Sequence, residues 1–250
     1  GKMGKVVCSI VKDDPDCVIA AGIDPYGESD DFPVFRSPSE CNVDADVIID
    51  FSTASAVPAL LDFSVSKKIP VVLCTTGFSD ELNEQVKKAS EKTAVLKSAN
   101  MSVGVNLLFS LVQKAALALA DSGFDMEIVE KHHNQKIDAP SGTAITLAEG
   151  ILENIDRKDK WVEGTFTAPD GTISGTTDCA PDELPISSIR EGEVFGIHTV
   201  RYESDIDSIS ITHDAKNRGG FVLGAILAAE YTAHHEGFLG MKNLFPFLNE

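Results

Sequence analysis

The stretch "DVIIDFSTASAVPALLDFSVSKKIPVVLCTTG", residues 46–77, decides the fold. Its two ends, 46–52 and 70–77, are near-continuous apolar runs that finish in Ser or Gly, as strands buried on both faces of a parallel sheet do. Between them, residues 55–68 have the apolar periodicity of a helix with one polar face. A strand, a helix and a second strand in this order predict parallel strands joined by a crossover helix.

The same alternation extends to both sides of this stretch. Residues 17–24 and 93–99 are further apolar runs, and residues 80–92 are amphipathic like a helix. We therefore predict an α/β fold with an N-terminal doubly wound, Rossmann-like parallel sheet. Ligands of such sheets bind beyond the carboxyl ends of the strands. The residues expected around this crevice are Asp24, Asp50 to Ser52, Cys74 to Gly77 and Ser98 to Met101.

The first residues of the chain suggest what binds there. "GKMG", residues 1–4, fits the latter half of a glycine-rich turn that opens a helix, where backbone N–H groups approach a pyrophosphate. By itself it also fits an ordinary glycine-containing turn, because the strand and first glycine of the motif would precede Gly1. Asp24 follows Gly4 by 20 residues, at the end of a predicted strand, where the acid that binds an adenosine ribose belongs. Together these features predict a nicotinamide dinucleotide site.

After residue 103 the strands and helices no longer alternate. The predicted elements are helices over 105–120, 143–155 and 221–235, and strands over 125–133, 195–203 and 207–213. This order predicts a second, α+β domain built on an open, mostly antiparallel sheet. We expect the apolar helix 221–235 to pack back on the first domain. The predicted division is a dinucleotide-binding domain over 1–102 and 219–250, and a substrate-binding and tetramerisation domain over 103–218.

The composition excludes several classes of protein. The chain has 250 residues, 43% of them hydrophobic, and a net charge of −18, which repels nucleic acids and anionic membranes. None of its apolar stretches approaches the ~20 residues that span a bilayer. Its five cysteines are scattered without a CxxC pair, which favours reduced thiols and a cytoplasmic location. We expect no nucleic-acid or membrane partner, and an anionic ligand would need a local cluster of positive groups.

Such a cluster occurs in "EKHHNQKIDAPSGTA", residues 130–144. His132, His133 and Lys136 lie at the end of a predicted strand, and Ser141 can cap the helix that starts directly after it. Unpaired N–H groups at a helix N-terminus attract carboxylates, and imidazoles exchange protons near neutral pH. The stretch therefore predicts a carboxylate-binding site with proton-transfer groups beside it.

Two other interpretations of this cluster stay open. It also fits a solvated basic patch on the surface. Adjacent histidines can bind zinc, but neighbouring residues of a strand point to opposite faces and no third ligand is nearby in the sequence, so we predict no metal. Taken singly, the remaining histidines fit ordinary surface or core positions; they are His198, His213, His234 and His235.

The longer stretch "EIVEKHHNQKIDAPSGTA", residues 127–144, resembles the signature of the dihydrodipicolinate reductase family. Other segments similar to that family, in the same order, are "IDFST" (49–53), "CTTGF" (74–78), "SANMSVGVN" (98–106), "GEVFGIHTV" (192–200) and "ITHDAKNR" (211–218). The resemblance covers the whole chain. It implies NAD(P)H-dependent reduction of 4-hydroxy-tetrahydrodipicolinate, or dihydrodipicolinate, to tetrahydrodipicolinate in diaminopimelate and lysine biosynthesis. It also implies a homotetramer.

The resemblance assigns roles by position. His132 matches the acid/base of the family and Lys136 its proton donor. The positions that match substrate contacts are His133, Lys136, Ser141, Gly142 and Thr143. The positions that match cofactor contacts are Gly1, Lys2, Met3, Gly4, Asp24, Phe51, Cys74, Thr75, Thr76, Ser98, Ala99, Asn100 and Met101. The chain departs from the family pattern at Cys74, where many members have Gly, and at Met101, where many have Phe.

The residues around the predicted ribose site favour NADH over NADPH. Asp24 can accept hydrogen bonds from both ribose hydroxyls, whereas it would repel the 2′-phosphate of NADPH. Pro25 stands where many family members have an Arg that pairs with this phosphate, and Thr53 adds no positive charge. Lys2 stands where the family often has a basic residue near the same phosphate. We therefore expect NADH to be preferred and NADPH to remain usable.

Two further functions remain as alternatives. One is another two-domain NAD(P) oxidoreductase that acts on a different small acid. The other is a redox-sensing or scaffold protein that binds a dinucleotide without chemistry, but such a protein has no need of His132, Lys136 and the Pro-Ser-Gly-Thr turn together. Turnover of the dihydrodipicolinate precursor would separate these alternatives.

Overall fold

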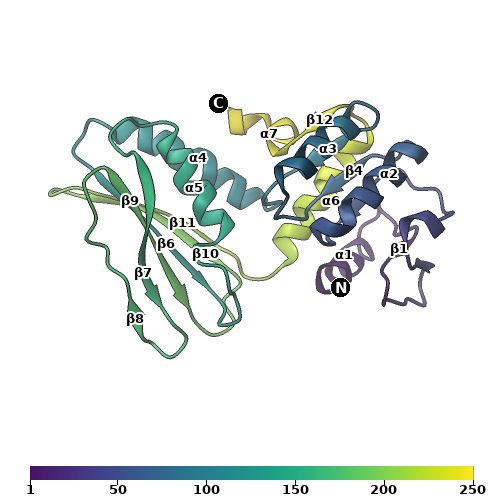
Figure 1. Cartoon of the computed structure of the whole chain (residues 1–250), viewed down its shortest axis with the longest axis horizontal. Helices are drawn as coiled ribbons and strands as arrows, with labels where there is room; N and C mark the ends of the chain where they lie inside the picture. The colour runs from purple at the N-terminus through teal and green to yellow at the C-terminus, as the bar shows by residue number, and fades with distance from the viewer. Residues whose placement is uncertain (250) are drawn as a thin grey trace. The chain divides into compact units, whose positions relative to one another are not determined.

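The computed structural model describes residues 1–249, which form two compact units. One unit comprises Gly1–Val103 together with the segment that begins at Arg218, and the other comprises Gly104–Asn217. The chain therefore leaves the first unit, builds the second, and returns to finish the first (Figure 1). Each unit has its own main sheet and its own hydrophobic core.

The first unit is built on a parallel sheet with the strand order β12-β5-β4-β3. Its strands are β3 (Ile48–Asp50), β4 (Val71–Leu73), β5 (Val95–Lys97) and β12 (Phe238–Leu239). Every neighbouring pair is parallel, so the carboxyl ends of these strands lie at one edge of the sheet. The predicted Rossmann-like sheet is confirmed, and β12 is a strand that the sequence did not indicate.

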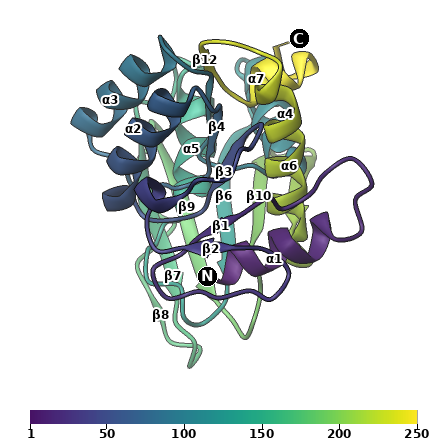
Figure 2. The same cartoon turned by 90° about the vertical axis from the view of Figure 1, so that its right-hand side faces the viewer.

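Helices cover both faces of this sheet. Alternate residues of the strands point to opposite faces, so Val71 and Leu73 pack with the helices of one face and Val72 with those of the other. Figure 2 shows α2 (Val57–Lys67) and α3 (Asp80–Ser90) on one side, and α6 (Gly219–Ala233) and α7 (Met241–Leu244) on the other. The predicted packing of the last long helix on the first domain is thus confirmed. Short 3₁₀ turns occur at Pro38–Glu40, Ala54–Ala56 and Pro246–Asn249.

The N-terminal helix starts where the sequence predicts it. Helix α1 (Lys2–Val11) follows Gly1 directly, and its Val7 and Val11 pack against Val222 of α6. The first N–H groups of this helix have no intrahelical acceptors, which is the arrangement that a glycine-rich phosphate turn provides.

The predicted strand over residues 17–24 is wrong in its length and its place. Only Gly22–Ile23 (β1) is extended, and it pairs in parallel with Val34–Phe35 (β2) in a small separate sheet. The apolar run is not buried as a central strand would be, because Val18 is 85% exposed. The prediction from apolar content alone was therefore too long for this strand.

The second unit is built on a mixed sheet with the strand order β11-β10-β6-β9-β7-β8. Its strands are β6 (Asp125–His132), β7 (Lys160–Thr167), β8 (Ile173–Ser174), β9 (Glu183–Arg190), β10 (Ile197–Glu203) and β11 (Ser208–Asp214). The pairs β10–β11, β10–β6 and β7–β8 are antiparallel, whereas β6–β9 and β7–β9 are parallel. The predicted α+β domain with an open, mostly antiparallel sheet is confirmed; β7, β8 and β9 were not foreseen.

Two helices, α4 (Val103–Leu119) and α5 (Gly142–Leu152), lie over one face of this sheet (Figure 1). Met126 and Ile128 of β6 alternate with less buried residues and point into the core beneath these helices. The buried Tyr202 hydroxyl donates to the Val112 carbonyl of α4 at 2.5 Å, which fixes this helix on the sheet. The same face of β6 continues toward its end with Glu130 and His132.

Among the described residues, no helix has both the length and the apolar character needed to cross a bilayer. All five cysteines are free thiols.

Candidate functional site

Three neighbouring strands bring polar side chains together beyond the core of the second unit. Glu130 on β6 lies opposite His198 on β10 and opposite Ser188 on β9, and His132 lies opposite Arg190. Paired residues share a face of a sheet, so all five side chains project to the same side. They are buried, and Glu130 is 0% exposed. A charged group in such a place must be fully paired to be tolerated.

Glu130 is paired on both carboxylate oxygens. Its Oε1 accepts hydrogen bonds from the Ser188 hydroxyl at 2.8 Å and from Arg190 Nη2 at 3.1 Å. Its Oε2 accepts the Ser141 N–H at 3.1 Å and lies 3.3 Å from His132 Nε2. Burial alone would raise the pKa of Glu130, but the hydrogen bonds from His132, Ser141 and Ser188 outweigh it and hold the pKa well below its usual range. Glu130 is therefore a carboxylate that faces His132.

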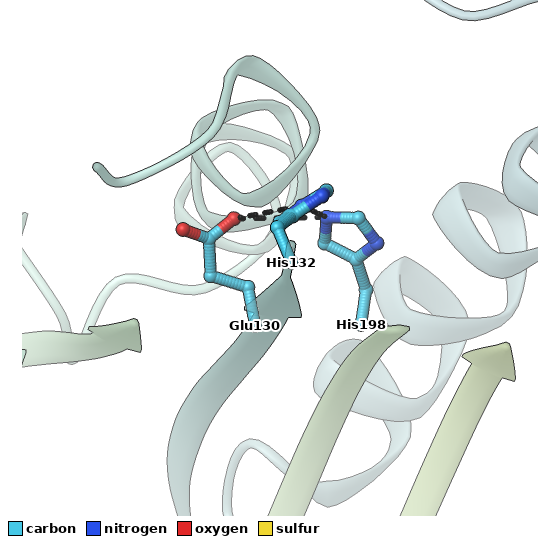
Figure 3. A group of neighbouring side chains, drawn as sticks. All are labelled: Glu130, His132 and His198. Atoms are coloured by element: carbon cyan, nitrogen blue, oxygen red, sulfur yellow. Dashed lines mark hydrogen bonds and ion pairs between the residues drawn. The ribbon is translucent and has the colours of Figure 1, made fainter. Parts of the chain in front are cut away.

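His198 completes a group of three side chains with Glu130 and His132, which we call the Glu130 cluster (Figure 3). The Nε2 atoms of the two histidines are 3.3 Å apart, and His198 Nε2 is 3.1 Å from the Ser141 hydroxyl. Burial, followed by the neighbouring His132, lowers the pKa of His198 to about 3, so this ring is neutral. His198 is a core imidazole, which is one of the two ordinary positions expected for it, and strand pairing places it against His132.

The loop after β6, residues 133–141, carries Lys136 and is named here the Lys136 loop. Lys136 Nζ forms an ion pair with Asp138 at 2.7 Å. The buried Arg190 side chain donates to the carbonyl oxygens of Lys136 at 3.2 Å and Asp138 at 2.6 Å, and to Glu130 as well. One guanidinium therefore fixes the loop and the Glu130 cluster relative to each other.

The Lys136 loop ends at the N-terminus of α5. Ser141 is the N-cap, because its hydroxyl accepts the Ala144 N–H at 3.2 Å, as the sequence predicts. Gly142 and Thr143 follow in the first turn, at the positive end of the helix dipole. The structure thus brings His132, Lys136 and the start of α5 together, and His133 follows His132 directly, half-buried.

Within the first unit, Asp24 lies at the start of α1. Its Oδ2 accepts a hydrogen bond from the Gly1 nitrogen at 2.9 Å, and its Oδ1 accepts the N–H groups of Tyr26 and Gly27 at 2.9 Å each. This places the predicted ribose acid beside the predicted phosphate turn of Gly1, Lys2, Met3 and Gly4. Arg36, which the sequence did not single out, donates to the carbonyl oxygens of Pro25 and Gly27 and so adds a cation next to Asp24.

The other predicted cofactor residues follow the carboxyl ends of the parallel strands; they are Phe51, Cys74, Thr75, Thr76, Ser98, Ala99, Asn100 and Met101. Thr75 Oγ1 is buried and has no hydrogen-bond partner among the described residues. Burial raises the pKa of the Cys74 thiol, so this side chain stays neutral. The Met101 side chain is buried in the core, so only its main chain can face a cofactor.

The comparisons with known proteins identify a family that covers both units. The family model for the N-terminus of dihydrodipicolinate reductase matches residues 1–101, and the model for its C-terminus matches residues 104–245. The 4-hydroxy-tetrahydrodipicolinate reductase of Caldanaerobacter subterraneus subsp. tengcongensis is 42% identical over 231 residues, which cover 92% of this chain and 88% of that protein. The enzyme of the same name from Clostridium tetani is 38% identical over 250 residues, covering 100% of this chain and 94% of that protein.

A solved structure is similar over nearly the same length. It is a dipicolinate-bound dihydrodipicolinate reductase from Paenisporosarcina sp. TG-14, with a TM-score of 0.78 and 25% sequence identity. The match covers 96% of this chain and 94% of that one, so it includes both units.

Proposed function

Because the chain belongs to the dihydrodipicolinate reductase family, we propose that the Glu130 cluster and the Lys136 loop form the catalytic centre of a 4-hydroxy-tetrahydrodipicolinate reductase. The protein is a pyridine-nucleotide-dependent reductase that acts on a small dicarboxylate. The assignment of the site rests on one observation. The buried His132 side chain contacts the Glu130 carboxylate, and the loop that follows carries Lys136 and ends at the N-terminus of α5.

His132 is proposed to supply the proton of the reaction. NAD(P)H supplies a hydride when it is bound, and reduction of a C=C bond conjugated with an imine then requires a proton. Nε2 of His132 faces Glu130, which leaves Nδ1 as the atom that exchanges a proton with the substrate. Gly196 makes room beside this atom, because a Cβ there would lie 3.3 Å from Nδ1 and 3.0 Å from Cε1.

Lys136 and the first turn of α5 are proposed to hold the substrate carboxylates. An ammonium group and helix N–H groups both bind carboxylates, and His133, Ser141, Gly142 and Thr143 lie in or beside this loop. The family resemblance also implies a proton donor at Lys136; because the reduction takes up one proton, Lys136 is proposed to act on the same proton as His132. Its ion pair with the exposed Asp138 is only a surface interaction, so a substrate carboxylate can replace that partner at small cost.

The first unit is proposed to bind the dinucleotide and the second unit the substrate, within a homotetramer in the cytoplasm. For the cofactor we propose NADH as the preferred form and NADPH as a usable one. Asp24 favours a ribose without a 2′-phosphate. Lys2 and Arg36 supply positive charges that offset part of the repulsion between Asp24 and a 2′-phosphate. The residues in the first unit fit a dinucleotide because Asp24 lies at the N-terminus of α1.

A coupled assay tests the proposed reaction. Aspartate semialdehyde, pyruvate and the upstream synthase generate the substrate, and the fall in NADH absorbance measures reduction. We expect turnover with the full chain and a loss of at least about a hundredfold in His132→Gln, since general acid catalysis contributes about 10²–10⁴-fold. Absence of turnover in the unmodified protein would favour a reductase for a different small acid.

A further inference from the structure

Three ligand-type atoms of the Glu130 cluster converge on one point. They are His132 Nε2, His198 Nε2 and Glu130 Oε2 (Figure 3). The two nitrogens are 3.3 Å apart, and they lie 3.3 Å and 3.8 Å from the carboxylate oxygen. We propose that these three residues form a binding site for a divalent transition-metal ion, with Zn²⁺ as the best chemical match, and that an ion there inhibits the reductase.

The distances fit a zinc ion closely. The point equidistant from the three atoms lies about 2.0 Å from each of them, and zinc bonds to imidazole nitrogen and carboxylate oxygen are about 2.0–2.2 Å. The two rings meet edge to face, with centroids 5.1 Å apart and an interplanar angle of 71°.

The donor set has the chemistry that zinc prefers. Two histidines and one glutamate with an open fourth position are a known zinc ligand set. Arg190 and Ser188 hold the other oxygen of Glu130 and fix the orientation of its carboxylate.

This proposal differs from the prediction of no metal made from the sequence. From the sequence, His132 and its neighbour His133 were the expected pair of ligands, and no third ligand was nearby. The structure supplies the further ligands from the same face of the sheet: Glu130 is two residues before His132, and His198 comes from the adjacent strand β10. His133 takes no part in the site.

Two features limit the affinity of the site. Coordination through His198 Nε2 puts the ring proton on Nδ1, which is buried and has no acceptor among the described residues. The Ser141 hydroxyl, 3.1 Å from the same Nε2, must also turn away. Loss of such supporting hydrogen bonds weakens metal sites by about 10–100-fold, so we expect micromolar rather than nanomolar binding.

The inhibition, unlike the binding, rests on the proposed function. An ion on His132 Nε2 replaces the proton that this atom shares with Glu130 and places two positive charges beside the ring. The ring can then no longer become an imidazolium, and transfer of its remaining Nδ1 proton to the substrate would leave an imidazolate, which is a much poorer outcome than a neutral imidazole. Zn²⁺ should therefore inhibit turnover reversibly, and a chelator should restore it.

Cobalt titration tests the site without any need for activity. Co²⁺ added to the purified full chain at neutral pH should give the visible absorption bands of a low-coordinate nitrogen–oxygen site, at one ion per chain, and Zn²⁺ should abolish them. His198→Gln should weaken Co²⁺ binding at least about tenfold. His235→Gln and Cys17→Ser should not change it; Cys17 belongs to the other group of potential ligands among the described residues, with Asp14 and Glu230.

The outcomes separate the two parts of the proposal. Absence of the bands, or their loss in Cys17→Ser but not in His198→Gln, would overturn the site while turnover in the coupled assay still supports the reductase. Bands that depend on His198, with turnover unaffected by saturating Zn²⁺, would instead overturn the proposed role of His132 in proton transfer.

Discussion

Replacing Arg190 by Met should expose how much of the site depends on one buried guanidinium. Arg190 is 3% exposed, and it bonds Glu130 and the carbonyl oxygens of Lys136 and Asp138. Methionine is shorter, but it replaces the aliphatic part of the arginine side chain and provides no donor. Glu130, which is fully buried, would then keep its charge without its cationic partner.

The expected cost follows from the burial of this ion pair. Removing one partner of a buried pair destabilises a protein by about 3–5 kcal/mol, because an uncompensated charge remains in the interior. Arg201→Met is the matched control on β10, which lies on the other side of β6 from β9. Arg201 pairs with Glu127 and Glu203, but its side chain is 45% exposed. An exposed pair of this kind contributes about 0.2–1 kcal/mol.

Urea unfolding followed by fluorescence measures both variants. Trp161, the only tryptophan of the chain, lies on β7 and therefore reports on the second unit. Combining Arg190→Met with Glu130→Gln should recover at least half of the lost free energy, because a neutral amide needs no counter-charge. If Arg190→Met costs no more than Arg201→Met, the inference that Glu130 depends on Arg190 is refuted.

The remaining predictions concern the loop, the cofactor and a close backbone contact. Lys136→Ala should lower kcat/KM in the coupled assay by about 10²–10⁴-fold while the free energy of unfolding changes by less than about 1 kcal/mol; a large fall in stability with normal turnover would contradict its role. NADH should exceed NADPH in kcat/KM by about tenfold, and Lys2→Ala should reduce NADPH use selectively; an equal loss for both cofactors would place Lys2 on their common pyrophosphate. Gly224→Ala should lower stability by about 3 kcal/mol in thermal unfolding, because a Cβ would overlap the Met101 main chain; an unchanged melting temperature would show that this segment can move away.

Local patterns in the sequence predicted the elements whose residues carry their own signals. The strand–helix–strand stretch over 46–77 forms β3, α2 and β4, and Ser141 caps α5 as expected. Alternation along β6 also places Glu130 on the same face as His132. That signal was present in the sequence, but its significance was missed.

The rest of the site depends on strand pairing, which no local pattern encodes. His198 on β10 and Arg190 on β9 contact Glu130, although they follow it by 68 and 60 residues in the sequence. Strand β9, "ELPISSIR", includes a proline, two serines and an arginine, so it does not look like a buried strand. Its polar residues are tolerated there because Glu130 and the loop carbonyls satisfy them.

The insertion of the second unit into the first imposes an order on folding during synthesis. Residues 104–217 are contiguous, so their core can close as soon as they leave the ribosome. The first unit, although it is made earlier, must wait for α6 to cover one face of its sheet and for β12 to pair with β5. Until then, the apolar face of its sheet and the edge of β5 stay open to association with other chains. The first unit, whose translation begins first, is therefore the last to bury the surfaces that could cause aggregation.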